Sequence, residues 1–264
     1  MNARTLSRLC LCVALLAAGC SRHRLVPATP GAPRLVVLTY NVNFGLDGEP
    51  ATVAAIQRSG ADVVFLQETT PGWERALRGL HAIYPHQAYH HDGGAGGMAV
   101  LSRLPFRQLE HLPSPVGWFA AWRVLVASPL GPLQVLQVHL RPPVSDRGSW
   151  VSGYFTTGSF RRGEIEHFAR HLRPGLPTLV VGDFNEGDGG KAVRYLADRG
   201  LRSVLADAGS TETTWRWQTS LGQLSLRLDH ICYSRELAPL RAQVLRQGRS
   251  DHLPVLAVFQ PAIR

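Results

Sequence analysis

The sequence predicts an α/β fold in which two mixed β-sheets pack face to face and helices cover their outer sides. Short β-α-β units occupy the first part of the chain, and apolar runs that pair as hairpins follow them. The apolar runs predict roughly ten to twelve strands in total. A single open, twisted sheet rarely contains that many strands. Two stacked sheets with the helices outside accommodate that number.

The first half of the chain alternates strands with short helices. Strands are predicted where Val and Leu dominate, and a Gly/Asp/Pro turn separates the first strand from the first helix. A glycine-rich stretch at 93–97 divides the last two strands of this half. The predicted order is strand 35–40, helix 50–59, strand 61–66, helix 73–79 and two strands within 86–101.

The second half begins with a hairpin. Segments 118–127 and 133–139 pair across the turn Pro129-Leu130-Gly131. A long loop at 141–160, rich in Ser, Gly and aromatic residues, comes next. The remaining predicted elements are helix 162–172, strand 178–182, helix 190–199 and closing strands at 227–233, 242–246 and 254–259.

The first nineteen residues have the features of an export signal. Arg4 and Arg8 precede an apolar stretch at 9–18 that is too short to span a bilayer as a stable helix. Small residues then lead to Cys20 in a pattern like the bacterial lipobox, with an ordinary cleaved signal as the alternative. We therefore expect a lipoprotein that is anchored through acylated Cys20 to a membrane facing the periplasm.

Residues 20–33 are polar and proline-containing, and we expect them to form a tether. Residues 34–260 then suit one domain, which we expect to be monomeric. Once the signal is removed and Cys20 is acylated, Cys232 is the only other cysteine, so no internal disulfide is available. The formal charge of +9 favours a polyanionic partner, although Lys191 as the only lysine among 28 basic residues also suggests a coding bias.

Five short polar clusters each close a strand-like apolar run. In layered α/β folds such strand ends gather along one rim, where distant side chains converge. Their Asn, Glu, Asp and His side chains are rich in oxygen and contain no thiol, which suits a hard divalent cation and attack of water on phosphorus. The clusters are TYNVN at 39–43, LQE at 66–68, VHL at 138–140, GDFN at 182–185 and SDH at 250–252.

The order and the residues of these clusters resemble the motifs of the endonuclease/exonuclease/phosphatase superfamily. This superfamily includes pancreatic deoxyribonuclease, exonuclease III, bacterial sphingomyelinases and inositol-polyphosphate phosphatases. Two further motifs, GMAVLSR at 97–103 and LRLDHI at 226–231, also resemble family motifs. Each motif alone is weak evidence for the family, whereas seven motifs in the family's order are a specific signal. The resemblance covers about residues 34–259 and implies a four-layer α/β/β/α sandwich.

Glu68 is the first candidate metal ligand. A carboxylate that ends a buried strand needs a partner, and Mg²⁺, or Mn²⁺ in its place, would supply the missing charge; pairing with an arginine is the alternative. By resemblance, Glu68 matches the family's metal-binding glutamate, Asn41 the asparagine beside metal and phosphate, and Asp251 a residue near the metal. Asn43 stands where some relatives carry an aspartate, which favours one metal over two, although it also fits a turn leading into Gly45.

The resemblance also implies the catalytic residues. In the family, the aspartate that matches Asp183 positions or deprotonates the attacking water, and the asparagine that matches Asn185 helps to hold the phosphate. His252 would contact the scissile phosphate, and we expect Asp229 to accept a hydrogen bond from one of its ring nitrogens. His139 corresponds to a second phosphate-facing histidine that stabilises charge on the leaving oxygen or protonates it.

Two other groups of residues compete for a function. A histidine-rich segment suggests zinc or copper, but its spacings match no recognised ligand pattern; it contains His81, His86, His90, His91 and Asp92. The loop at 141–160 and its flank hold aromatic and basic residues that would either stack on a base or lipid headgroup or pack on one another; these are Trp150, Tyr154, Phe155, Arg141, Arg147, Arg161 and Arg162.

The sequence therefore favours a Mg²⁺-dependent phosphoester hydrolase that cleaves a phosphodiester, in nucleic acid or in a phospholipid headgroup, by attack of water on phosphorus. A phosphodiesterase or endonuclease comes first. A sphingomyelinase-like enzyme, an inositol-phosphate-like phosphatase and a non-catalytic binding lipoprotein are the alternatives.

Overall fold

The computed structural model describes residues 25–144, 148, 153, 156–220 and 222–263. Its strands, in chain order, are β1 (Leu35–Asn41), β2 (Val63–Gln67), β3 (His86–His90), β4 (Met98–Ser102), β5 (Phe106–Leu112), β6 (Ala121–Ser128), β7 (Gly131–His139), β8 (Thr178–Asp183), β9 (Arg202–Ser203), β10 (Trp215–Thr219), β11 (Gly222–Leu226), β12 (Asp229–Tyr233), β13 (Leu237–Val244) and β14 (Val255–Pro261). The helices are α1 (Pro50–Arg58), α2 (Pro71–Leu77), α4 (Gly158–Ala169), α5 (Lys191–Ala197) and α6 (Val204–Asp207), with short 3₁₀ turns at Arg78–Leu80 and Gly94–Gly96.

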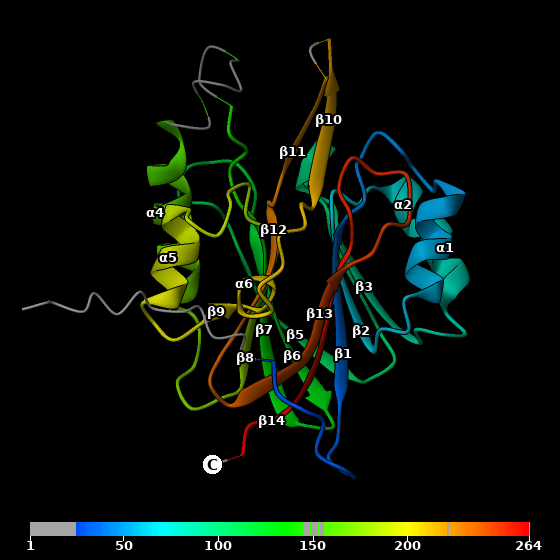
Figure 1. Ribbon diagram of the computed structural model, residues 1–264. Helices are drawn as coiled ribbons and strands as arrows, with labels where there is room; N and C mark the ends of the chain where they lie inside the picture. Colours follow the sequence, from blue (N-terminus) through cyan, green and yellow to red (C-terminus); the bar gives the residue numbers. More distant parts are fainter. Residues whose placement is uncertain (1–24, 145–147, 149–152, 154–155, 221, 264) are drawn as a thin grey trace, which may run out of the picture.

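Two six-stranded sheets lie face to face in the middle of the molecule (Figure 1). The first sheet has the order β13-β14-β1-β2-β4-β3, and the second has the order β5-β6-β7-β8-β12-β9. Each sheet is mixed, because β1–β2 and β7–β8 are parallel pairs while the neighbouring pairs are antiparallel. Helices α1 and α2 cover the outer side of the first sheet, and α4 and α5 cover the outer side of the second.

Three apolar interfaces separate the four layers. Successive residues of β1 supply two of them, since Val37 packs between the sheets while Leu38 packs under the outer helices. Both faces of the central strands are therefore buried, which explains their continuous apolar runs. The third interface joins β8 to α4 and α5 through Val180, Ile165, Phe168 and Leu196. The predicted four-layer α/β/β/α sandwich is confirmed.

The described residues form fourteen strands rather than the expected ten to twelve. The sequence did not predict β5, β9, β10 or β11, because these strands lie at sheet edges or outside both sheets and are largely exposed or very short. Such strands need no continuous apolar run, since backbone pairing alone defines them. Conversely, residues 118–120 do not belong to β6, and β13 begins at Leu237, earlier than the predicted closing strand at 242–246.

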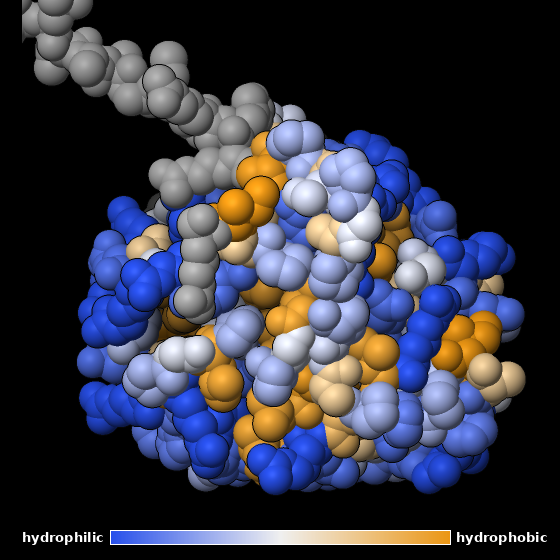
Figure 2. Space-filling model, turned by 90° about the horizontal axis from the view of Figure 1, so that it is seen from below, coloured by the Kyte–Doolittle hydropathy of each residue, from blue (hydrophilic) through white to orange (hydrophobic). Residues whose placement is uncertain are grey.

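Residues 25–33, the second part of the predicted tether, have no regular secondary structure but contact the domain. The Val26 N–H donates to the Pro239 carbonyl oxygen at 3.0 Å, and the Thr29 N–H donates to Gln260 Oε1 at 2.9 Å. These contacts lie toward the start of β1, away from its end at Asn41. At this end of the molecule hydrophobic and hydrophilic residues are mixed (Figure 2).

The predicted signal and Cys20 lie outside the described residues. Among the residues that the structure describes, none of the helices has the length and apolar character needed to span a bilayer.

Gly182 allows β7 and β8 to meet at the carboxyl end of the second sheet. Its φ is +137°, and a Cβ atom there would lie 1.9 Å from the Val138 carbonyl oxygen, so no other residue fits without a backbone shift. The close approach sets the next residue, Asp183, directly beside His139 in the parallel register.

Candidate active site

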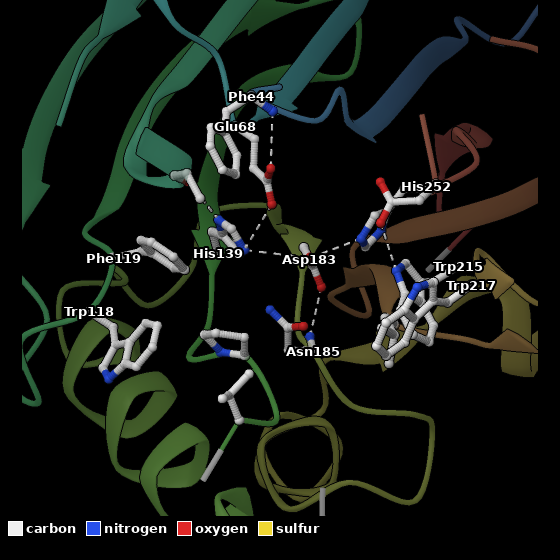
Figure 3. A pocket seen from close by; sticks show the side chains of 15 residues that line it. Phe44, Glu68, Trp118, Phe119, His139, Asp183, Asn185, Trp215, Trp217 and His252 are labelled. Atoms are coloured by element: carbon white, nitrogen blue, oxygen red, sulfur yellow. Dashed lines mark hydrogen bonds and ion pairs between the residues drawn. The ribbon is translucent and has the colours of Figure 1, made fainter. Parts of the chain in front are cut away.

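A pocket with a volume of about 390 Å³ opens where the carboxyl ends of β1, β2, β7 and β8 come together (Figure 3). Its polar side chains come from both sheets and from the loop before β14; they are Glu68, His139, Asp183, Asn185, Asp251 and His252. Its aromatic side chains are Phe44, Trp118, Phe119, Trp215 and Trp217. Every predicted site residue either lines this pocket or hydrogen-bonds to one that does.

Strand register brings three predicted residues side by side. His139 at the end of β7 pairs with Asp183 at the end of β8, and Asp183 pairs with Asp229 at the start of β12. The first sheet meets this row where Asn41, the last residue of β1, donates from Nδ2 to Asp183 Oδ2 at 3.2 Å. The contact links the carboxyl ends of the two sheets at one point.

Unusual backbone conformations are concentrated at this site. In the described part of the chain, the non-glycine residues with positive φ are Asn43 (64°), Glu68 (62°) and Asn185 (52°). Such conformations cost on the order of 1 kcal/mol or more each and persist only where the surroundings impose them. All three residues lie within two positions of a strand end, and each lines the pocket or hydrogen-bonds to a residue that does, which is typical of a functional site.

Glu68 carries a carboxylate without a full countercharge. Oε1 accepts a hydrogen bond from Asn41 Nδ2 at 2.9 Å, and Oε2 accepts one from the Phe44 N–H at 3.1 Å. Within the described residues its recorded ion-pair partner is His139, whose Nε2 lies 3.9 Å from Oε1, so the alternative of a pairing arginine is not realised. Burial raises the pKa of Glu68, which is the behaviour expected of a buried carboxylate that lacks a cation.

Asp183 lies at the centre of the polar groups. Oδ1 accepts the Asn185 N–H at 2.8 Å, while Oδ2 lies 3.6 Å from Nε2 of both His139 and His252. Burial raises the pKa of this carboxyl group despite the two nearby histidines. Asn185 is itself fixed, because its Nδ2 donates to the Leu140 carbonyl oxygen at 2.9 Å.

The predicted hydrogen bond between Asp229 and His252 is confirmed. His252 Nδ1 lies 2.9 Å from Asp229 Oδ2, and the opposite ring nitrogen faces Asp183. Burial alone would lower the pKa of His252, but the carboxylates of Asp229 and Asp183 outweigh it and raise the pKa to about 10. The ring is therefore an imidazolium at neutral pH, with one N–H aimed into the pocket.

His139 has the opposite character. Burial lowers its pKa to about 4, so the ring is neutral at pH 7. Nδ1 lies 3.2 Å from the Ala95 carbonyl oxygen, which can only accept, so we assign the ring proton to Nδ1 and leave Nε2 as an acceptor facing the pocket. The Phe119 ring stacks on this imidazole with centroids 4.1 Å apart and shields it from water.

Asp251 is held by two neutral donors. Asn43 Nδ2 donates to Oδ1 and Trp215 Nε1 donates to Oδ2, each at 2.9 Å. Burial acts to raise the pKa of Asp251, but the His252 charge and these two donors outweigh it, so the pKa is lowered. The contact with Trp215 was not predicted from the sequence. Asn43 both closes a turn, by accepting the Gly45 N–H at 2.9 Å, and orients Asp251.

Two groups of side chains at this site offer oxygen and nitrogen atoms as possible metal ligands. One consists of Asp183, Asp229 and His252, whose ligand atoms all lie within 4.8 Å of one another. The other consists of Glu68 and Asn41. Asp229 is fully buried and its Oδ2 is already bonded to His252, whereas the Glu68 side chain is 16% exposed in the pocket. Of the two groups, Glu68 is therefore the more accessible from the pocket.

The histidine-rich segment does not assemble into a metal site. His91 Nε2 lies 2.6 Å from Glu74 Oε2, and Asp92 Oδ2 lies 3.0 Å from His111 Nε2. The His90 ring stacks on His111 with centroids 4.2 Å apart. Among the described residues, the single cluster of three or more groups that meets the spacing of a metal site is the one at Asp183.

The loop at 141–160 is described only in part. Arg147, Trp150, Tyr154 and Phe155 lie outside the described residues. Arg161 is buried and pairs with Glu186 at 3.0 Å, and the Arg162 guanidinium lies 4.4 Å from the Tyr195 ring centroid, so both pack on the domain. Among the described arginines of this group, Arg141 lies nearest the pocket, because its guanidinium lies over the ring of the pocket residue Trp118.

Three solved structures with very similar folds have low sequence identity to this chain. TDP2 from D. rerio, complexed with single strand DNA product, is 18% identical with a TM-score of 0.66 over 86% of this chain and 99% of that chain. An AP endonuclease from Archaeoglobus fulgidus is 16% identical with a TM-score of 0.66 over 85% and 99%. ANGEL2, a 2',3'-cyclic phosphatase, is 16% identical with a TM-score of 0.65 over 89% and 98%.

A search of curated protein sequences gave no significant match. A family model, in contrast, matches residues 38–252, a range that runs from β1 to His252 and contains every predicted site residue. Together with the structural neighbours, this match indicates phosphoester hydrolysis. The chain belongs to the endonuclease/exonuclease/phosphatase family.

Proposed function

We propose that the protein is a Mg²⁺-dependent phosphodiesterase of the nuclease type, which cleaves its substrate by attack of water on phosphorus. One observation carries the proposal: Asp183 Oδ2 lies 3.2 Å from an amide of the first sheet and 3.6 Å from each of two histidines of opposite charge state. A carboxylate base, an imidazolium and an acceptor imidazole thus surround one small volume. Water activation and stabilisation of phosphoryl oxygens need this set of groups.

Glu68, with Asn41 and Asp251 beside it, would hold one Mg²⁺, for which Mn²⁺ would substitute. The cation would neutralise negative charge on the phosphate, which is the usual contribution of such an ion to phosphoryl transfer. The donor set fits this ion, because Mg²⁺ prefers oxygen ligands and keeps several waters. The raised pKa of Glu68 fits as well, since a bound cation would restore the ionised form.

The side chains of the protein would activate the attacking water and bind the phosphate. Asp183 accepts the proton of the attacking water, whose oxygen bonds to phosphorus as the bond to the leaving oxygen breaks. The charged His252 ring, held by Asp229, donates to a phosphoryl oxygen, and Asn185 helps to hold the phosphate. The neutral His139 ring offers Nε2 as an acceptor, which favours orientation of the attacking water over protonation of the leaving oxygen.

A substrate panel tests this proposal. Purified protein with Mg²⁺ or Mn²⁺ is expected to cleave plasmid DNA, RNA or bis-p-nitrophenyl phosphate, and excess chelator is expected to abolish the reaction. Sphingomyelin and inositol phosphates in the same panel cover the alternative functions. Full activity in chelator would contradict the metal dependence, and release of inorganic phosphate from monoesters alone would favour a phosphatase.

We also propose that residues 1–19 form the signal, that Cys20 anchors the tether at 20–33 to a periplasm-facing membrane, and that residues 34–260 are a monomeric catalytic domain. The lipobox-like pattern supports the anchor. Because Val26 and Thr29 contact the end of the domain opposite the pocket, an anchored protein would present its pocket away from that membrane.

Substitution of Cys20 tests the anchor. The Cys20→Ser protein is expected in the soluble fraction or as an unprocessed form, because the tether itself is too polar to insert. Cys12→Ser, which keeps the acylation position, serves as the matched control and is expected to stay with membranes. Membrane association of the Cys20→Ser protein after a high-salt wash would disprove the lipid anchor.

A further inference from the structure

Exposed aromatic side chains are concentrated at the pocket. Of the seven large hydrophobic side chains exposed in the described chain, three line the pocket, namely Phe44, Trp118 and Trp217. Trp217 is 45% exposed and Trp118 is 42% exposed, and they stand at opposite ends of the row formed by His139, Asp183 and His252, Trp118 at the His139 end and Trp217 at the His252 end (Figure 3). The phosphate site therefore has an aromatic wall on each side.

The wall that carries Trp217 is connected directly to the catalytic segment. Trp215 forms an isolated β-bridge with His252, and the Arg216 N–H donates to the Asp251 carbonyl oxygen at 3.0 Å. Trp217 follows two residues later on the same face of β10, with its ring centroid 6.1 Å from that of Trp215. Backbone pairing thus sets the position of the start of β10 relative to His252, and Trp217 lies on that strand.

The opposite wall is also fixed by its neighbours. The Phe119 ring stacks on His139, and the Trp118 ring lies edge-on to Phe119 with centroids 5.8 Å apart. The Arg141 guanidinium lies 5.3 Å from the centroid of the Trp118 ring. Trp118 is therefore held near His139 through the Phe119 ring, and Trp217 is held near His252 through Trp215.

We infer that the substrate is a single-stranded nucleic acid, and that the bases on the two sides of the scissile phosphate stack on Trp217 and Trp118. This inference rests on the proposed phosphodiesterase function. A flat ring beside a phosphate site offers each neighbouring base a stacking platform. Bases within a duplex have both faces covered by their neighbours, so these platforms select unpaired nucleotides. The formal charge is +9 for the whole sequence, and removing the two charges of Arg4 and Arg8 in the proposed signal leaves +7, which suits a polyanion.

The chemistry of the β10–β11 hairpin favours nucleic acid over a lipid surface. The hairpin projects from the molecule (Figure 1). Its described residues nearest the turn are Gln218, Thr219, Ser220, Gly222 and Gln223, and Leu224 is the large apolar residue of its described part that is exposed outside the pocket, at 47%. A membrane-inserting hairpin would present several apolar residues there, whereas most of the described residues near this turn are polar. Its tryptophans instead line the pocket, close to the phosphate-binding groups.

Binding of a labelled oligothymidylate, followed by fluorescence anisotropy in excess chelator to prevent cleavage, tests the inference. Trp217→Ala is expected to weaken binding by roughly tenfold to a hundredfold, the effect of losing one stacked base, and Trp118→Ala by a similar factor. Trp217→Phe should recover most of the affinity, because it keeps a ring. Gln218→Ala, on the opposite face of the same strand, is the control with unchanged affinity.

An oligomer with abasic positions separates stacking from other effects of the substitution. Wild-type protein should bind it more weakly than oligothymidylate. Trp217→Ala should lose part of this difference, and the double variant Trp118→Ala/Trp217→Ala should bind the two oligomers equally, because no ring is left for a base to stack on. Equal affinity of wild type for duplex and single strand, or unchanged affinity in Trp217→Ala, would overturn the inference. So would a Trp217-dependent association with phospholipid vesicles combined with ring-independent oligomer binding.

The outcome for this inference is separate from that for the proposed function. Ring-dependent binding without hydrolysis in any divalent cation would support the binding site and disprove the hydrolase. Metal-dependent hydrolysis with ring-independent binding would support the hydrolase and disprove the stacking site.

Discussion

Replacing Glu68 with glutamine is expected to lower the rate of phosphodiester hydrolysis by roughly a thousandfold or more, because the cation loses the carboxylate charge that holds it. The amide has nearly the same shape and keeps one of the two hydrogen bonds, because Asn41 donates to Oε1 and the Phe44 N–H donates to Oε2, and one of these atoms remains an acceptor in glutamine. The protein is therefore expected to stay folded. Loss of activity with an unchanged melting temperature would assign the effect to the metal site.

The measurement is the initial rate over a range of Mg²⁺ and Mn²⁺ concentrations, with thermal unfolding measured in parallel. Glu166→Gln is a matched control, because this glutamate is 39% exposed on α4 and pairs only with neighbouring arginines of its own helix turn. Its rate should equal that of the wild type. A Glu68→Gln protein with wild-type activity would disprove the proposed role of Glu68.

Replacing Asp229 with asparagine is expected to lower kcat by roughly a hundredfold or more with little change in KM, the size of effect typical of a misplaced acid–base group. Asparagine removes the carboxylate that raises the pKa of His252 and keeps its ring protonated. Nε2 of His252 then no longer carries the proton that it donates toward the phosphate. The contribution arises in the transition state, when negative charge builds on the phosphoryl oxygens.

A double-mutant cycle distinguishes this positioning role from a purely structural one. Combined with His252→Ala, the Asp229→Asn change should cost little beyond His252→Ala alone, because both changes remove the same interaction. An Asp229 that only stabilises the start of β12 predicts additive losses instead. Asp198→Asn, at an exposed position after α5, is the control that should keep full activity.

The sequence was sufficient to predict the four layers because the central strands are buried on both faces. Residues such as Val37 and Leu38 must both be apolar when one faces the other sheet and the next faces a helix. The β10–β11 hairpin escaped prediction for the opposite reason. Nearly all its residues are exposed, and its position depends on backbone contacts with Asp251 and Leu253, which lie more than thirty residues further along the chain.

The polar clusters at strand ends predicted the pocket, since chain order and strand order place Asn41, Glu68 and Asp183 at one rim. The aromatic contacts were not predictable. The Trp215 hydrogen bond to Asp251 and the Phe119 stack on His139 join segments that are distant in sequence, and no local pattern marks them. Trp118 was expected within a strand, but it lies before β6, at the pocket rim.

The position of the cation can be measured by anomalous scattering from crystals soaked in Mn²⁺. We expect one strong peak in the pocket beside the Glu68 carboxylate, with the hydrogen bond between Asp229 and His252 intact. A strongest peak among Asp183, Asp229 and His252 with that hydrogen bond broken, or no peak in the pocket at all, would contradict a Glu68-bound metal and with it the proposed hydrolytic site.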